Sequence, residues 1–317
     1  MGFYMDFVAI FIGLILLIKG GDWLLEAAVA LSLRINIPKI VIGMTVVSFA
    51  TSAPELIVSV KSAMKGYPDL ALGNVVGSNI ANLALVLGII LVISPIKVTP
   101  SFYKVDWPIM MVATLFFYFF LQADASLDQL EGGVLFVLLI LFLMYILLFQ
   151  KKAVVEDQLV EVQENRRSWA ALGLVFFAGG FFLWLGSEVL VSSAVLLAKS
   201  LGVSERIISI SVVSIGTSIP ELSASIIAII NKEKAISIGN LIGSNIFNIL
   251  AVMGVTAMIH PVRVKDLSLL DIDFIWMIGV SLLILPLVFL PKKMWLGRFE
   301  GLCLLVVYGF FLNQMFG

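Results

Sequence analysis

Long apolar runs separated by short polar turns constrain this chain more than any other feature. A helix needs about 20 apolar residues to cross the hydrocarbon core, and lipid permits only helices and closed barrels. These runs are continuous rather than alternating, which argues against a barrel. We therefore predict an all-α polytopic membrane protein with ten transmembrane helices, near residues 3–33, 39–64, 70–93, 105–121, 130–150, 169–200, 206–230, 236–259, 273–290 and 298–316.

Composition supports this class and excludes others. Of the 317 residues, 61% are hydrophobic and 13% are charged, whereas soluble proteins have about 45–50% and about 25%. A net charge of −1 offers no basic surface for nucleic acid. Cys303 and His260 are the only cysteine and histidine, which disfavours an intramembrane hydrolase and a Cys/His metal site. No cofactor or obligate protein partner is indicated, so we expect a non-enzymatic, multi-pass protein of the cell membrane.

Two motifs recur at one spacing along the chain. Thr51-Ser52-Ala53-Pro54-Glu55 returns 166 residues later as Thr217-Ser218-Ile219-Pro220-Glu221, and the segment 73–82 returns at the same offset as 239–248. Each copy contains five apolar runs, and an odd number makes the second copy enter the membrane from the opposite side. We therefore predict two inverted five-helix repeats, 1–150 and 169–317, joined by a polar linker at 151–168, an arrangement found in many secondary transporters.

The repeated motifs place polar oxygen atoms inside apolar spans. Pro54 lacks an N–H and should kink its helix, moving Ala53 away from helical geometry and releasing carbonyl oxygens between Ser48 and Thr51. Pro220 should do the same in the second copy. Hydroxyl groups three and four residues before each glutamate share a helix face with it, and Ser78 and Asn82 are also four residues apart. Glycines 73, 77, 239 and 243 should let their helices approach the kinked helices closely.

Glu55 and Glu221 are the two carboxylates of this pattern, and an ionisable residue inside a membrane span indicates a functional site. Oxygen-only sites of about six to eight ligands suit calcium. One Ca²⁺ would neutralise the two carboxylates, and so would two or three Na⁺. Packing glycines and hydroxyls that bond back to their own helices are the structural alternative, but two copies of such a constellation favour an ion site.

At these motifs the chain resembles the sodium/calcium exchanger family of the cation/calcium exchanger superfamily, most of all its compact prokaryotic members. The resemblance extends over nearly the whole chain. It implies an antiporter that exchanges sodium for calcium by alternating access, with both ions as its transported substrates. It also implies calcium ligands at Glu55, Glu221, Thr51 and Thr217, and sodium ligands at Ser48, Ser52, Ser78, Ser214, Ser218 and Ser244.

One position departs from the family pattern. Many members have aspartate where this chain has Asn248, so that Asn82 and Asn248 both line the site as amides. An amide does not titrate, and this position therefore cannot carry a proton. A proton/calcium exchanger and a potassium-dependent exchanger of the same superfamily remain alternatives, as does a cation channel.

The distribution of Lys and Arg predicts the orientation of the chain in the membrane. With ten spans both termini lie on one side, whose loops carry six basic residues, and the opposite side carries thirteen. Cytoplasmic loops are enriched in Lys and Arg. We expect the linker 151–168 in the cytoplasm and both termini outside.

A cysteine placed in the linker tests this orientation. Gln158→Cys in a background with Cys303→Ser should react with a membrane-impermeant thiol reagent only from the cytoplasmic side, because the linker is predicted there. Labelling in inside-out vesicles, compared with labelling of intact cells, is the measurement. Reaction in intact cells would reverse the predicted orientation.

Overall fold

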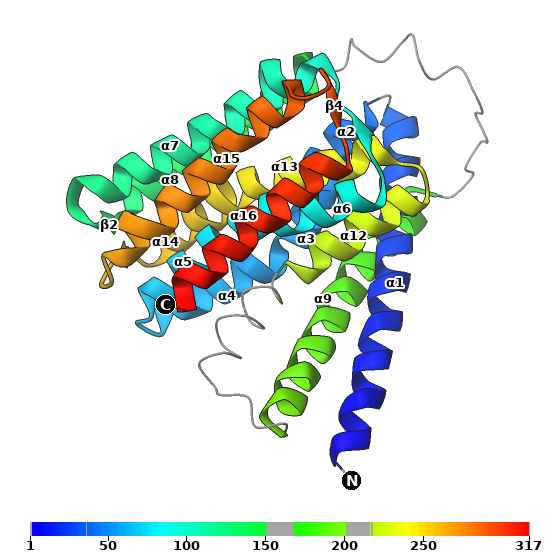
Figure 1. Ribbon diagram of the computed structural model, residues 1–317, viewed down its shortest axis with the longest axis horizontal. Coiled ribbons are helices and arrows are strands. Elements are labelled where there is room, and N and C mark those ends of the chain that lie inside the picture. The colour runs from blue at the N-terminus through cyan, green and yellow to red at the C-terminus, as the bar shows by residue number, and fades with distance from the viewer. Residues whose placement is uncertain (1, 36, 150–167, 201–215, 217, 317) are drawn as a thin grey trace. The chain divides into compact units, whose positions relative to one another are not determined.

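A computed structural model describes all of the chain except residues 1, 36, 150–167, 201–215, 217 and 317 (Figure 1). The described part is helical apart from four strands of two residues each. Seven helices there are long and apolar enough to cross a membrane, or eight if the bent pair 39–51 and 53–64 counts as one span. The predicted all-α polytopic class is therefore confirmed. The last predicted helix is present but falls outside that set, and much of the predicted helix at 206–230 lies outside the described residues.

The chain forms two compact units, which are treated separately below. Unit 1 consists of Met1–Thr51 with Phe142–Asn240, and unit 2 consists of Ser52–Leu141 with Leu241–Gly317. Each unit therefore contains segments from both predicted repeats. The helices of unit 1 are α1 (Gly2–Ile35), α2 (Lys39–Ile42), the π-helical segment η1 (Gly43–Val47), α3 (Ser48–Thr51), α9 (Trp169–Ser200), α12 (Ile219–Ile230), the end of α8 (Gln129–Phe149) and the start of α13 (Lys234–Phe247).

Helices α1 and α9 lie side by side in unit 1, in blue and green in Figure 1. A Cβ atom built on Gly13 would lie 3.0 Å from the carbonyl oxygen of Gly186, and one on Gly20 would lie 2.9 Å from that of Gly179. The residue nearer the C-terminus of α1 thus contacts the residue nearer the N-terminus of α9, so the two helices are antiparallel. Gly179 and Gly186 are the repeats of Gly13 and Gly20 at the offset of 166, which makes this contact reciprocal.

A second close approach in unit 1 joins α2 to α13. A Cβ atom on Gly239 would overlap the carbonyl oxygen of Ile40, and one on Gly43 would lie 2.5 Å from that of Ile236. The expected close approach of Gly239 to the first kinked helix is therefore confirmed. At the ends of these helices Lys39 Nζ and Glu233 Oε1 form an ion pair at 2.7 Å.

Unit 2 contains the remaining elements, and its strands pair across the two halves of the sequence. Strand β1 is antiparallel to β4, with Ile96 opposite Leu296, and β2 is antiparallel to β3, with Leu127 opposite Val262. The elements are α4 (Ala53–Met64), α5 (Pro68–Ile80), η2 (Ala81–Val86), α6 (Leu87–Ile93), β1 (Ile96–Lys97), η3 (Phe102–Asp106), α7 (Trp107–Asp124), β2 (Ser126–Leu127), most of α8, the end of α13, η6 (Asn248–Met253), α14 (Gly254–Ile259), β3 (Val262–Arg263), η7 (Leu269–Asp273), α15 (Phe274–Phe289), β4 (Trp295–Leu296) and α16 (Arg298–Phe316).

Two spans are far more buried than the others. Protein covers 72% of the most apolar window of Pro68–Ile93 and 78% of that of Lys234–Ile259, against 22–39% in the other spans of the described chain. Both contain the repeated Gly-Asn and Gly-Ser-Asn motifs, so these polar residues are kept away from lipid. Gly73 makes no close approach, since the nearest atom to a Cβ built there is 3.8 Å away on Leu269. The expectation for that glycine is wrong.

The expected helix breaks occur one residue before their predicted positions. Ser52 has φ −84° and ψ 0°, and Ser218 has φ −91° and ψ 3°, both in the bridge region of backbone conformation. The helices that follow begin at Ala53 and Ile219, which are therefore helical and not displaced as expected. The reason is that Pro54 and Pro220 fall in the first turn of a new helix, where the missing N–H has no intrahelical partner to lose.

The α1–α9 contact predicts different effects for two glycines. Gly20→Ala should lower the free energy of unfolding by about 1–3 kcal/mol, because the added Cβ would lie 2.6 Å from the backbone nitrogen of Leu183. Gly173→Ala on α9 has no neighbour within 4 Å and should be neutral or stabilising by up to about 1 kcal/mol. Thermal unfolding midpoints of the purified proteins measure both. Equal midpoints for the two variants would contradict the tight glycine contact.

Candidate cation-binding site

The polar residues of unit 1 form a chain of hydrogen bonds between α3 and α13. Thr51 Oγ1 donates to Asn240 Oδ1 at 3.2 Å, and Asn240 Nδ2 donates to Ser225 Oγ on α12 at 3.1 Å. Ser48 Oγ lies 3.0 Å from the carbonyl oxygen of Asn240 and 2.8 Å from that of Gly43. Thr51 and Ser48 are fully buried. These contacts fix the hydroxyl groups of α3 against the second copy of the Gly-Asn motif.

Unit 2 contains the equivalent contact from the first copy. Asn74 Nδ2 donates to Ser59 Oγ at 3.0 Å and to the carbonyl oxygen of Glu55 at 3.3 Å. Asn74 and Ser59 recur at the offset of 166 as Asn240 and Ser225, which are bonded to each other in unit 1. The two units therefore use the same asparagine–serine pair to hold the helix that follows each break.

The two glutamates are completely buried. Glu55 is in the first turn of α4 in unit 2, and Glu221 is in the first turn of α12 in unit 1. Each side chain has a relative exposure of 0%. Both lie at a helix N-terminus, where the positive end of the helix dipole favours an anion. A buried carboxylate is nevertheless expensive without further positive charge.

A reciprocal network of asparagines joins the π segments of unit 2. Asn79 Nδ2 lies 3.4 Å from the backbone carbonyl oxygen of Asn245, and Asn245 Nδ2 lies 3.4 Å from that of Asn79. Asn248 Nδ2 donates to Asn79 Oδ1 at 3.1 Å and to Ser78 Oγ at 3.0 Å. Asn82 Nδ2 donates to Asn245 Oδ1 at 3.3 Å. All four side chains are buried.

These contacts determine which way the amides of Asn82 and Asn248 face. A backbone carbonyl only accepts hydrogen bonds, so Asn79 and Asn245 must turn their NH₂ groups toward each other's main chain. Their Oδ1 atoms then require the NH₂ groups of Asn248 and Asn82. The Oδ1 atoms of Asn82 and Asn248 are left buried and accept no hydrogen bond from the described residues. Two carbonyl-type oxygens are therefore available as cation ligands.

Ser52 and Ser218 supply two more oxygens of this kind. Both occupy the N-cap position of a helix, where a serine hydroxyl usually accepts a backbone hydrogen bond. Neither side chain caps its helix, and each Oγ atom is buried without a hydrogen-bond partner in the described part of the chain. The hydroxyls at both helix breaks thus remain available to a ligand.

The structure places most of the predicted site residues, but not all. Ser78 and Ser244 are buried on α5 and α13 in unit 2. Thr217 and Ser214 lie outside the described residues. No group of three or more His, Cys, Asp or Glu residues in the described ranges could hold a metal ion. The other potential cation ligands among the described residues are hydroxyl, amide and carbonyl oxygens.

Sequence reasoning missed the residues that orient these ligands. Asn79 and Asn245 lie in the repeated segments 73–82 and 239–248 but were not predicted to take part in the site, and Ser59 and Ser225 lie four residues after the two glutamates. The signal was available, because both pairs recur at the offset of 166. Their contacts could not be read from the sequence, since each pairs with a residue on another helix.

The described residues contain seven or eight apolar spans together with buried carboxylates, amides and hydroxyls, which is typical of a multi-pass membrane transport protein. A family model described as sodium/calcium exchanger protein matches residues 5–148 and 171–316. The chain therefore belongs to the sodium/calcium exchanger family, whose members are membrane antiporters for cation/calcium exchange. The predicted resemblance to this family is confirmed.

Individual relatives agree over nearly the full length. The candidate antiporter CaxA of Alkalimonas amylolytica is 36% identical over 95% of both chains. The sodium/calcium exchanger MaX1 of Methanosarcina acetivorans is 29% identical over 98% of both chains. A solved structure of the sodium-calcium exchanger NCX_Mj, soaked with zero Na⁺ and Ca²⁺, matches with a TM-score of 0.82 and 27% identity, over 98% of this chain and 99% of that one.

The asparagine network predicts a stability effect. Asn79→Ala should lower the free energy of unfolding by about 1–3 kcal/mol, because Asn248 Nδ2 loses the acceptor at Asn79 Oδ1 in a buried position. Asn313→Ala, at an exposed position on α16, is the matched control and should have little effect. Thermal unfolding of the purified variants measures the difference. A wild-type midpoint for Asn79→Ala would contradict the proposed amide orientation.

Proposed function

We propose that this chain is an antiporter that exchanges sodium for calcium across the cell membrane by alternating access. The observation that carries the proposal is the repetition of one ligand set in both halves of the sequence. Each half has a buried glutamate, a buried helix-break serine and a buried asparagine at equivalent positions: Glu55, Ser52 and Asn82, and Glu221, Ser218 and Asn248. Each half thus supplies a carboxylate, a hydroxyl and an amide oxygen, which are the ligand types that Ca²⁺ and Na⁺ accept.

Charge balance supports calcium as one transported ion. Two buried carboxylates would carry a charge of −2, and one Ca²⁺ or two to three Na⁺ would offset most of it. We propose Glu55, Glu221, Thr51 and Thr217 as the calcium ligands. The proposed sodium ligands or site-lining residues are Ser48, Ser52, Ser78, Asn82, Ser214, Ser218, Ser244 and Asn248.

The architecture in this proposal is that of two inverted five-helix repeats, with a cytoplasmic linker at 151–168 and both termini outside. The antiparallel α1–α9 pair supports the inversion within unit 1, because Gly13 contacts the repeat of Gly20 and Gly20 contacts the repeat of Gly13. The reciprocal bonds of Asn79 and Asn245 support it within unit 2. The names of MaX1 and NCX_Mj, both sodium/calcium exchangers, support sodium as the coupling ion.

Sodium is favoured over protons by the amides at two positions. Asn82 and Asn248 are fully buried and neither can bind or release a proton in the physiological range. Proton coupling would then depend on Glu55 and Glu221 alone. A proton/calcium or a potassium-dependent exchanger is the second candidate, and the flux experiment below separates the three.

Calcium flux in proteoliposomes tests the function. Vesicles containing the purified full chain are loaded with Na⁺ and diluted into sodium-free buffer with radioactive Ca²⁺. Uptake should depend on the outward sodium gradient, should not require K⁺ in the outer buffer, and should be absent with an equal gradient of H⁺ alone. Uptake driven by the pH gradient without sodium would refute sodium coupling, and calcium current without a counter-ion requirement would indicate a channel.

The paired glutamates give a sharper prediction. Glu55→Gln and Glu221→Gln should each reduce sodium-driven calcium uptake by at least about a hundredfold, because each removes half of the site's formal charge and one potentially bidentate ligand. Asp124→Asn, at an exposed position at the end of α7, is the control and should transport normally. Thermal unfolding confirms that the variants are folded. Wild-type uptake in both glutamine variants would rule out the two-glutamate calcium site.

A further inference from the structure

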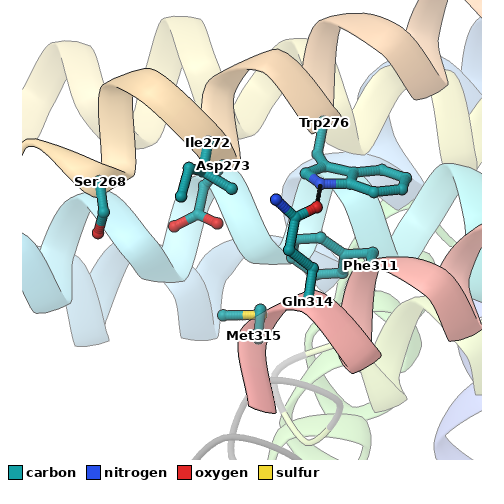
Figure 2. A pocket seen from close by; sticks show the side chains of 7 residues that line it. All are labelled: Ser268, Ile272, Asp273, Trp276, Phe311, Gln314 and Met315. Carbon is teal, nitrogen blue, oxygen red and sulfur yellow. Dashed lines mark hydrogen bonds between the residues drawn. The ribbon is translucent and has the colours of Figure 1, made fainter. Parts of the chain in front are cut away.

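A pocket in unit 2 lies apart from all of the proposed ion ligands. It is formed between the η7–α15 segment and the end of α16 and has a volume of about 190 Å³. Figure 2 shows its lining side chains, which are Ser268, Ile272, Asp273, Trp276, Phe311, Gln314 and Met315. None of them belongs to the repeated motifs, so the exchange reaction leaves this pocket unexplained.

The polar groups of the pocket have defined directions. Trp276 Nε1 donates to Gln314 Oε1 at 2.8 Å, and the indole of Trp276 stands edge to face with the ring of Phe311 at 5.7 Å. An indole N–H only donates, so Gln314 must turn its oxygen toward Trp276. Its NH₂ group then points to the side of the pocket where the Asp273 carboxylate lies (Figure 2). The pocket thus presents a hydrogen-bond donor and an anion beside an aromatic wall.

Asp273 has no cationic partner among the residues that the structure describes. Within the described residues no Lys, Arg or His nitrogen lies within ion-pair distance of this half-buried carboxylate. A second carboxylate, that of Asp266, lies in the loop before η7, and hydrogen bonds from the side chain and backbone of Ser268 lower the pKa of Asp266. The side of the pocket formed by Asp273 therefore favours a cation.

Three of the lining residues lie near the ends of their helices, where lipid headgroups are expected. Asp273 is the fifth residue of the span Leu269–Phe289, which places it only about 6 Å along the helix axis from the start of that span. Gln314 and Met315 are in the last turn of α16. Tryptophan is enriched at this membrane–water boundary because its ring is apolar and its N–H is polar. A ligand in this pocket can keep acyl chains in the bilayer.

We propose that this pocket binds the headgroup of phosphatidylethanolamine. The primary ammonium group donates hydrogen bonds to the Asp273 carboxylate, and a phosphate oxygen accepts one from Gln314 Nε2. The ethylene carbons of the headgroup pack against Phe311 and Met315. A charge-assisted hydrogen bond is roughly twice as strong as a neutral one, so most of the selectivity comes from Asp273.

This chemistry discriminates between common lipids. Phosphatidylcholine has a quaternary ammonium without N–H groups and cannot donate to Asp273. Phosphatidylglycerol has no cation that could offset the repulsion between its phosphate and the carboxylates of Asp273 and Asp266. The pocket should therefore favour lipids in the order of their remaining N–H donors.

The N-methylation series of lipids tests the proposal on the unmodified full chain. Lipids are titrated onto the detergent-purified protein, and bound lipid is counted by native mass spectrometry. Affinity should fall stepwise from phosphatidylethanolamine through its monomethyl and dimethyl derivatives to phosphatidylcholine, and water-soluble glycerophosphoethanolamine should compete. Equal binding of phosphatidylcholine or phosphatidylglycerol would overturn the proposal, as would displacement of the lipid by millimolar Na⁺ in preference to glycerophosphoethanolamine.

Two matched variants locate the site. Asp273→Asn should weaken phosphatidylethanolamine binding by about tenfold or more, whereas Asp271→Asn, two residues earlier in η7 at an exposed position outside the pocket, should leave it unchanged. Gln314→Leu removes the phosphate donor and should also weaken binding. Wild-type affinity in both Asp273→Asn and Gln314→Leu would overturn the assignment. If Asp273→Asn does not fold, the methylation series and Gln314→Leu still decide the outcome.

Discussion

The need to satisfy buried amides is the constraint on which the polar core of unit 2 depends. Asn79 and Asn245 each use their NH₂ groups on the other's backbone carbonyl, at 3.4 Å in both directions. These two bonds determine the orientation of every amide in the network. Once the NH₂ group of an asparagine donates to a backbone carbonyl, its Oδ1 atom can only accept, and it therefore needs the NH₂ group of another asparagine. The outcome is a pair of buried oxygens, on Asn82 and Asn248, that only a ligand with positive character can use.

The same logic explains why glycines and serines accompany the asparagines. Gly239 lets α13 approach α2 so closely that Asn240 reaches both Ser48 and Thr51. The hydroxyl group of Ser225 in turn accepts a hydrogen bond from the NH₂ group of Asn240. Backbone contact and hydrogen bonding therefore reinforce each other, and a larger residue at Gly239 would separate the groups that orient the hydroxyls of α3.

Much of the helical layout could be predicted from the sequence, because the length of an apolar run gives the approximate bounds of the helix that it forms in a membrane. Nine of the ten predicted helices agree with the structure to within four residues at either end. The helix breaks at Ser52 and Ser218 were indicated by the prolines that follow them. The π-helical segments, such as Ala81–Val86 and Asn248–Met253, were not predicted, because one extra residue in a helical turn leaves the apolar run unchanged.

The candidate site was predictable in residue type but not in geometry. The recurrence of Glu55 and Asn82 marked both as ligands without structural information. The strand pair of Ile96 with Leu296, and the bond of Asn248 to Asn79, join residues far apart in the sequence, and no local pattern specifies such partners. Thr217 and Ser214, which lie outside the described residues, remain predictions.

The mixed origin of the two units has a consequence for how the protein is made. Helix α1 ends at Ile35 and its partner α9 begins at Trp169, so at about 5–20 residues per second the ribosome needs roughly 7–27 seconds to reach the start of that partner. During this interval the glycine face of α1 and the amides of α5 are in the membrane without the surfaces that later cover them. The newly made first half must therefore be protected by lipid, by the insertion machinery or by temporary contacts of its own helices until synthesis of the second half is complete.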